Sequence, residues 1–277
     1  MVPAFRWFLA VLLMSIWAPA AAPASVEEPA VDCLELGLSL ERKEITLHEP
    51  VLATLRVINR CAQAGEIDLG RMAEGNLGLM VVAPDGMSED SRKRFESGLS
   101  FPGLVRLKKG EVHWQTVVLN EWYDRFNELG EYSVTIYIGE KTDWPEAPQA
   151  TATVQITPRD PERLKETCNN LEARAMQADT RVSTKAASAL GFVADEVCLP
   201  HLERVLKESD HGQEGALRGL ARIGTTGAIS ALVAGWDRLL NGERAIAWGL
   251  LDEAQRQLLV AELAKAGKQL KSEDPWN

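Results

Sequence analysis

The chain has 277 residues, of which 45% are hydrophobic and 25% charged, with 13 prolines, 21 glycines and only four cysteines. This composition excludes fibrous, collagen-like and disulfide-dense small proteins, and it fits one large or two modest globular domains. The formal net charge of −10 argues against a protein that binds nucleic acid through its phosphates, so no nucleic-acid partner is expected.

The first 24 residues are typical of a secretory signal peptide. Arg6 supplies a positive charge before an apolar run at residues 7–17, and small residues at positions 20–24 offer a cleavage site. We therefore expect a signal peptide over residues 1–24, export to the periplasm or the extracellular space, and no transmembrane segment once the signal is removed. The alternative is an uncleaved membrane anchor, but the run is shorter than the roughly 20 residues that cross a bilayer as a helix.

An exported chain meets an oxidising environment, where cysteines tend to pair. Cys33, Cys61, Cys168 and Cys198 form an even set, which allows three connectivities. Because the residue pattern changes near Pro158, we predict that Cys33 pairs with Cys61 and Cys168 with Cys198, each pair within one domain. Four buried free thiols are the alternative.

From Val31 to Ile156, within a domain that we expect over residues 25–157, the dominant hydrophobic period is two, which is typical of half-buried strands. Leucines occupy every second position at residues 34–40, and apolar residues do so at 51–57. Further strands are expected at 67–69, 77–82, 112–119, 132–138 and 151–156, with turns such as Pro84-Asp85-Gly86 between them. Seven short strands separated by turns predict a β-sandwich.

Several short motifs follow one another along these strands. They are Glu49-Pro50-Val51, Asn59-Arg60, Asp68-Leu69-Gly70, Pro84-Asp85-Gly86, Lys109-Gly110-Glu111 and Gly130-Glu131-Tyr132-Ser133-Val134. Their order resembles that of a bacterial immunoglobulin-like domain. The resemblance implies a binding or spacing module and carries over no catalytic residue. It also implies that the ring of Tyr132 packs in the core while its hydroxyl bonds at a corner of the sandwich.

After Pro158 the pattern becomes helical. Asp160, Pro161 and Glu162 provide an N-cap, a proline at the first helical position and an acid in the first turn. Six or seven short helices are expected over residues 158–277. Further N-cap candidates recur at Asp195, Asp210, Thr225, Asn241 and Asp252.

Two helical stretches match at a fixed offset of thirty, so that Leu190 falls on Leu220 and Leu202 on Leu232. The runs at 186–193 with 199–202, and at 219–224 with 228–232, resemble short HEAT-like repeats, and residues 243–265 resemble a degraded third unit. Helical hairpins of this kind stack into an α-solenoid. The predicted fold class is therefore multidomain, all-β plus all-α. An irregular helical bundle with a chance match is the alternative.

A search for catalytic or ligand-binding patterns finds none that is specific. The four histidines are scattered, and no metal-ligand, nucleophile or phosphate-loop spacing is present. His201 and His211 are expected to have solvated structural roles, and Ser88-Glu89-Asp90 to be solvated charge. We therefore expect no enzyme, no metal and no cofactor.

Two stretches are candidate partner-binding surfaces. The first is the long loop predicted at residues 84–103, which carries Arg92, Arg94 and Phe95. The second is the pair Trp122 and Tyr123 in a loop between two strands. The alternatives are a mobile surface loop for the first stretch and aromatic residues that cover the sandwich core for the second.

The sequence favours a non-catalytic exported binding or scaffold protein whose helical repeats receive a polypeptide partner. Residues 25–157 hold 13 basic and 22 acidic residues, whereas residues 158–277 hold 16 and 18. The acidic sandwich would favour a basic or neutral partner, or it only keeps the protein soluble. The alternatives are an envelope hydrolase with a site at the domain junction, or a protease inhibitor acting through the loop at 84–103.

Overall fold

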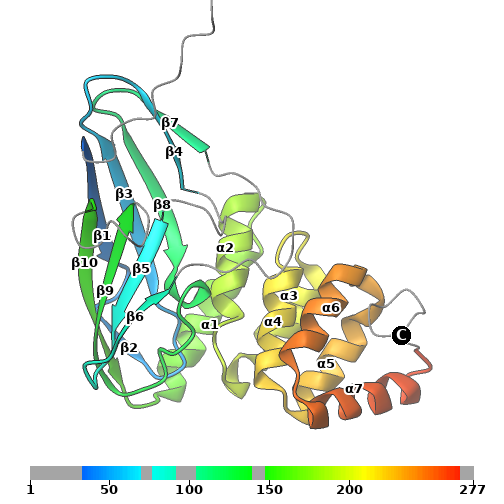
Figure 1. Ribbon diagram of the computed structural model, residues 1–277. Coiled ribbons are helices and arrows are strands. Elements are labelled where there is room, and N and C mark those ends of the chain that lie inside the picture. The colour runs from blue at the N-terminus through cyan, green and yellow to red at the C-terminus, as the bar shows by residue number, and fades with distance from the viewer. Residues whose placement is uncertain (1–32, 70–76, 92–103, 139–146, 269–277) are drawn as a thin grey trace, which may run out of the picture.

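The computed structural model describes residues 33–69, 77–91, 104–138 and 147–268, and within them it has a β part followed by a helical part (Figure 1). The last strand ends at Thr157 and the first helix begins at Pro161, so the secondary structure changes where the sequence pattern changes. The predicted signal peptide lies outside the described residues. Among the described residues, no helix is long and apolar enough to span a membrane.

The strands form two larger sheets and a two-stranded ribbon. The first sheet has the order β1 (Leu34–Leu40), β3 (Leu52–Asn59), β8 (Val112–Val118). The ribbon pairs β4 (Gly65–Asp68) with β7 (Leu104–Leu107). The second sheet is antiparallel except where β2 runs parallel to β10, and its order is β2 (Glu44–Thr46), β10 (Gln149–Thr157), β9 (Gly130–Ile138), β5 (Leu77–Val82), β6 (Ser88–Ser91).

The two sheets share one apolar core, as the alternating pattern predicts for a sandwich. Leu55 and Val57 from the first sheet and Val134 and Ile136 from the second are fully buried in it. Tyr132 is also fully buried, and its hydroxyl donates to the carbonyl of Arg125 at 3.2 Å and accepts from the backbone N–H of Glu128 at 3.1 Å. The expected role of Tyr132 at a corner of the sandwich is therefore confirmed.

Three strands were not predicted, because each is three or four residues long and has no clear apolar alternation. They are β2, β6 and β7. Ser88-Glu89-Asp90 lie in β6, which pairs with β5 at the edge of the sheet, and not in the predicted loop. Ser88 and Glu89 are exposed, as expected of solvated charge, whereas Asp90 is half-buried and accepts a hydrogen bond from the Tyr137 hydroxyl at 3.0 Å. Charged side chains on an edge strand discourage its pairing with another chain.

Seven α-helices follow in the described part of the chain, and three of the six predicted N-caps form the expected bonds. The side chains of Asp160, Asp195 and Asp252 accept hydrogen bonds from backbone N–H groups at helix starts. Thr225 precedes α5 without such a bond, Asn241 is the first residue of α6 and not its cap, and Asp210 is not a cap, because Gly212 precedes α4. The helices are α1 (Pro161–Ala175), α2 (Thr180–Leu190), α3 (Leu199–Glu208), α4 (Gln213–Ile223), α5 (Thr226–Gly235), α6 (Asn241–Leu250) and α7 (Glu253–Lys265).

The helices pack in two rows around a second apolar core. Helices α1, α3, α5 and α7 contact one another in succession, and so do α2, α4 and α6. Helices α1 and α2 lie beside the sandwich and α7 lies far from it (Figure 1). The two helices α2 and α4 approach closely, since a Cβ on Gly215 would lie 2.3 Å from the backbone of Ala187.

The predicted constant offset of thirty between repeats is wrong in detail. The first helices of the two units end at Leu190 and Ile223, but their second helices begin at Leu199 and Thr226. The connection in the first unit is longer because it contains the short 3-10 helix η4 (Glu196–Cys198). The first helices of the two units are therefore more than thirty residues apart and the second helices fewer than thirty, so that thirty is only the average spacing.

Candidate functional site

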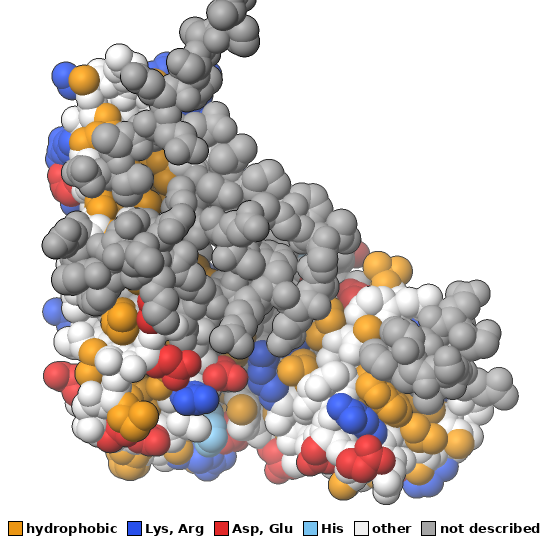
Figure 2. Space-filling view, in the orientation of Figure 1, with side chains coloured by type: hydrophobic (Ala, Val, Ile, Leu, Met, Phe, Trp, Pro, Cys, Tyr) orange, Lys and Arg blue, Asp and Glu red, His pale blue; other side chains and the backbone are white. Residues whose placement is uncertain are grey.

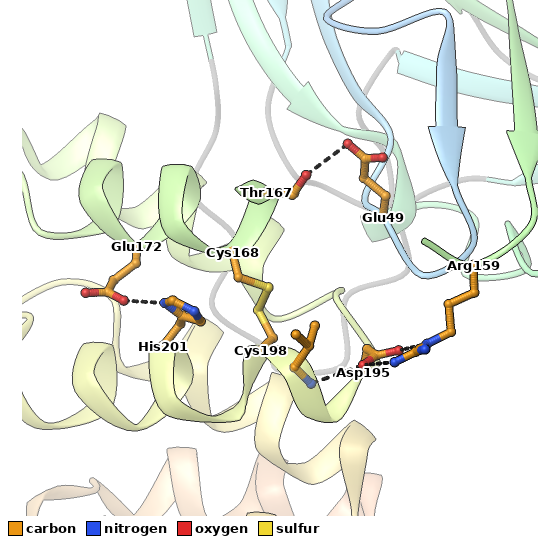
Figure 3. The surroundings of a disulfide bond; sticks show 9 residues. Glu49, Arg159, Thr167, Cys168, Glu172, Asp195, Cys198 and His201 are labelled. Atoms are coloured by element: carbon orange, nitrogen blue, oxygen red, sulfur yellow. Dashed lines mark hydrogen bonds and ion pairs between the residues drawn. A yellow bond between two sulfur atoms is a disulfide. The ribbon is translucent and has the colours of Figure 1, made fainter. Parts of the chain in front are cut away.

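The disulfides are paired as the sequence predicted. Cys33 bonds to Cys61 in the β part, and Cys168 bonds to Cys198 in the helical part, with Cα–Cα distances of 5.0 and 5.6 Å. No cysteine remains free. The second disulfide joins α1 to η4, directly below the contact between the helices and the sandwich (Figure 3).

The junction between the two parts is organised by one buried carboxylate, that of Glu49, whose side chain is only 4% exposed. One oxygen accepts from Arg42 Nη1 at 2.9 Å and from the Thr167 hydroxyl at 3.1 Å. The other accepts from the backbone N–H of Thr46 and from Arg163 Nε, both at 3.0 Å. Thr167 and Arg163 belong to α1, so Glu49 connects the β2–β3 turn to the first helix (Figure 3).

A strained residue precedes Glu49. His48 has a φ of 74°, in the left-handed region that side chains other than glycine rarely adopt. This conformation belongs to the turn that directs the Glu49 carboxylate at α1. Backbone strain of this kind persists where the surrounding contacts fix it.

Two further links secure the segment between the last strand and the first helix. The Thr46 hydroxyl donates to the carbonyl of Pro158 and accepts from the N–H of Asp160, both at 2.7 Å. Arg159 forms a two-pronged ion pair with Asp195, at 2.5 and 2.9 Å (Figure 3). The hydrogen bond from Arg159 holds the pKa of the Asp195 carboxyl below its ordinary value, despite the opposing effect of burial.

The sandwich also contacts α2. The Glu121 carboxylate accepts from the Ser188 hydroxyl at 2.5 Å and lies 3.7 Å from the Lys185 ammonium group. Beneath these polar contacts, Val118 of β8 is buried in the helical core and Leu52 of β3 packs against it. Apolar packing and charged pairs both contribute to the contact between the two parts.

A cleft of about 390 Å³ opens beside Glu49, between the start of β3 and the side of α1. Ile45 and Leu171 are buried in its wall, while Glu41, Arg42 and Arg174 carry its charge. The lining is completed by Glu49, Pro50, Leu52, Thr167, Asn170 and Ala173. Basic and acidic side chains also lie close together on the visible face where the two parts meet (Figure 2).

A second buried carboxylate lies within the helices. Glu172 of α1 is 8% exposed and contacts His201 Nδ1 at 2.5 Å and Arg204 Nη1 at 2.6 Å, both from α3 (Figure 3). The prediction of a solvated role for His201 is therefore wrong, because its side chain is only 13% exposed and is paired. His211 is exposed in a turn, as predicted.

The predicted partner-binding residues do not gather at this junction. Tyr123 is buried in the sandwich core with its ring edge-on to Phe126, and Trp122 packs against the same core. Burial raises the pKa of the Tyr123 hydroxyl. The two rings therefore cover the core, which was the alternative interpretation. Arg92, Arg94 and Phe95 lie outside the described residues.

The sequence interpretation missed the residues that build the junction. Glu49 stood next to a proline and was taken only as the start of a strand, and Arg159 stood in the linker. The partners of Glu49 in α1 lie more than a hundred positions away, and Asp195 lies 36 positions from Arg159, so no local pattern predicts these contacts. Among the residues that the structure describes, no cluster of three or more histidine, cysteine or acidic side chains could hold a metal ion.

No protein-family model and no curated protein matches this sequence. Among solved structures, the CARDB domain of a Pyrococcus furiosus protein in complex with di-metal ions is 12% identical over 46% of this chain and 94% of its own, with a TM-score of 0.28. A β-glucosidase from Listeria innocua is 19% identical over 46% of this chain, with a TM-score of 0.30, but only 16% of that enzyme is covered. Likenesses at these scores support no conclusion about fold or activity.

Proposed function

We propose that this chain is an exported, non-catalytic binding or scaffold protein, in which an immunoglobulin-like sandwich holds a HEAT-like helical stack. Two features support the fold assignments: the sheets enclose one core with a tyrosine at a corner, and the helices lie in two rows in chain order. The two disulfides support export, because such bonds persist in oxidising compartments.

The binding role is supported by the bonding of the charged groups at the junction. The buried carboxylates of Glu49 and Asp195 are bonded to arginines that link separate elements. Their oxygens are occupied by structural bonds, so the groups act as connectors rather than as free acids or bases. A rigid connection between two modules suits a protein that presents a fixed surface to a partner.

The two alternative functions gain less support. A hydrolase at the junction would need free carboxylates that converge in the cleft, but Glu49 accepts four hydrogen bonds there. A protease inhibitor would need an exposed loop at 84–103, but residues 88–91 of that stretch pair as an edge strand.

The proposal is tested by photo-cross-linking of the full chain, expressed with its own leader. A cross-linking side chain is placed at Lys207 on α3, at Arg218 on α4 or, as the matched control, at Glu131 on β9. We expect a discrete protein adduct from at least one helical position and none from Glu131. The intact mass of the recovered protein should correspond to a chain that begins at Ser25.

Two results would contradict the proposal. Adducts equally distributed over all three positions would indicate contacts without specificity, and a full-length mass would contradict cleavage after Ala24. Turnover of an envelope substrate that is lost on the change Glu41→Gln would establish the hydrolase instead.

A further inference from the structure

The cleft beside Glu49 has the properties of a small-molecule site, and these properties are independent of any protein partner. Its volume of about 390 Å³ lies near the lower end of the range of roughly 300–1,000 Å³ that is usual for such sites. It also lies between two packed modules, a common location for ligand pockets. The size suits a single small solute rather than an oligomer.

One wall of the cleft is apolar. Ile45 and Leu171 are each 3% exposed, and Pro50 and Leu52 lie beside them. An apolar group placed against this wall would leave water, with a gain in affinity for each methylene that is buried. The wall therefore favours a ligand with an aliphatic portion.

The lining of the cleft also includes one loose ion pair. Arg174 Nη1 and Glu41 Oε2 are 3.6 Å apart, and the two side chains are 36% and 38% exposed. An exposed pair at this distance contributes little stability, so exchanging it for other charged partners costs little. Arg174 could then bind a carboxylate of the ligand, and Glu41 an ammonium group.

Two other groups at the rim supply donors. Arg42 is held by Glu49 through one nitrogen, which orients its guanidinium group beside the cleft. A donor that is positioned before binding, as this one is, loses little freedom when a ligand arrives. Asn170 also lines the cleft; it is exposed, and its side-chain amide makes no hydrogen bond to any described residue, so that this donor can turn toward a carboxylate.

The charges of the lining decide between ligand classes. Two arginines, Arg42 and Arg174, are balanced by two glutamates, Glu41 and Glu49. A ligand that is only an anion or only a cation would leave one of these groups without compensation. A neutral zwitterion with separate positive and negative ends meets both.

We propose that this cleft binds a free amino acid with an aliphatic side chain, its carboxylate at Arg174 and Asn170, its ammonium group at Glu41 and its side chain against Ile45 and Leu171.

The test is titration calorimetry of the mature full chain with L-leucine. Four comparison ligands each change one feature: 4-methylpentanoate lacks the ammonium group, 3-methylbutylamine lacks the carboxylate, glycine lacks the side chain, and the dipeptide Leu-Leu is longer. We expect saturable binding of leucine at one site, with dissociation constants at least about tenfold higher for each comparison ligand. The first three ligands each lose a charged or apolar contact, and Leu-Leu carries its ammonium group and its carboxylate on different residues, too far apart for one small site.

Variants of two lining residues test whether leucine binds in this cleft. Arg174→Gln and Glu41→Gln should each weaken leucine binding about tenfold or more. Glu41→Gln should not weaken the binding of 4-methylpentanoate, which has no ammonium group and gains an Arg174 that is free of its partner. Arg218→Gln is the matched control, because it removes an arginine from an ion pair with Glu214 elsewhere on the helices and should change nothing.

Several outcomes would overturn the inference. These are the absence of leucine binding at concentrations up to about 10 mM, binding of 4-methylpentanoate as tight as that of leucine, tighter binding of Leu-Leu, or equal losses in the Arg174 variant and the Arg218 control. Each can be separated from the outcome of the cross-linking experiment, which uses other surfaces.

Discussion

The replacement Glu49→Ala offers a direct measurement of how strongly the sandwich and the helices are coupled. Four donors lose their acceptor when this side chain is removed. Two of them belong to α1, so the change acts on the connection between the modules as well as on local structure.

The expected cost follows from how deeply each donor is buried. Removing one member of a buried ion pair typically costs about 3–5 kcal/mol. Here Arg42 and Arg163 are 39% and 24% exposed and can recover some hydration, which lowers the cost. The Thr46 N–H and the Thr167 hydroxyl are buried and keep their full penalty. We expect a loss of about 3 kcal/mol in the free energy of unfolding, which lowers Tm by roughly 6–12 °C for a chain of this size.

The assay combines calorimetry with one probe for each part. Circular dichroism in the far ultraviolet follows mainly the helices, and hydrogen exchange of the backbone amides in β3 and β9 follows the sandwich core. In the native chain the two probes should change together. In the Glu49→Ala variant we expect the two transitions to separate, because the contacts of Glu49 with Arg163 and Thr167 of α1 are lost and the two parts are coupled less strongly.

Glu35→Ala is the matched control. Glu35 also accepts from two arginines, Arg56 and Arg60, but it is 41% exposed and lies wholly within the β part. Its loss should cost less than about 1 kcal/mol and should leave the transitions coincident. Equal destabilisation by the two changes, or a cost below about 1 kcal/mol for Glu49→Ala, would refute the view that the buried carboxylate holds the junction.

Three further predictions concern packing, the second disulfide and pH. Gly215→Ala should lower the free energy of unfolding by more than about 2 kcal/mol, because the added carbon overlaps the backbone of α2. At Gly249 the added carbon meets open space, so Gly249→Ala should be neutral or slightly stabilising. Chemical denaturation measures both changes. Replacing both Cys168 and Cys198 by serine should cost about 3–4 kcal/mol in the same assay, since the bond closes a loop of 30 residues. Because the pKa of Asp195 is lower in the folded chain, the contribution of this carboxylate to stability is present at neutral pH and is lost as pH falls below about 4. The variant Asp195→Asn keeps an N-cap residue but cannot titrate, so its free energy of unfolding should fall less steeply in acid. An acid profile equal to that of the native chain would contradict this assignment.

The sequence by itself determined the features that depend on near neighbours in the chain. Period-two alternation predicted the longer strands, because a strand that buries one face must alternate. Aspartates at positions 160 and 252 predicted helix starts, because a cap bonds to backbone only two or three residues away. An even number of cysteines on the two sides of Pro158 predicted both disulfides.

Only the tertiary structure decided the features that depend on residues far apart. The edge strand β6 exists because β5 pairs with it, and its own residues show no apolar period. The same holds for the junction: Glu49 meets Thr167 across more than a hundred positions, and Arg159 meets Asp195 over 36. The energy of such contacts depends on burial and distance, which arise when the chain has folded, so a linear pattern of residue types contains no sign of them.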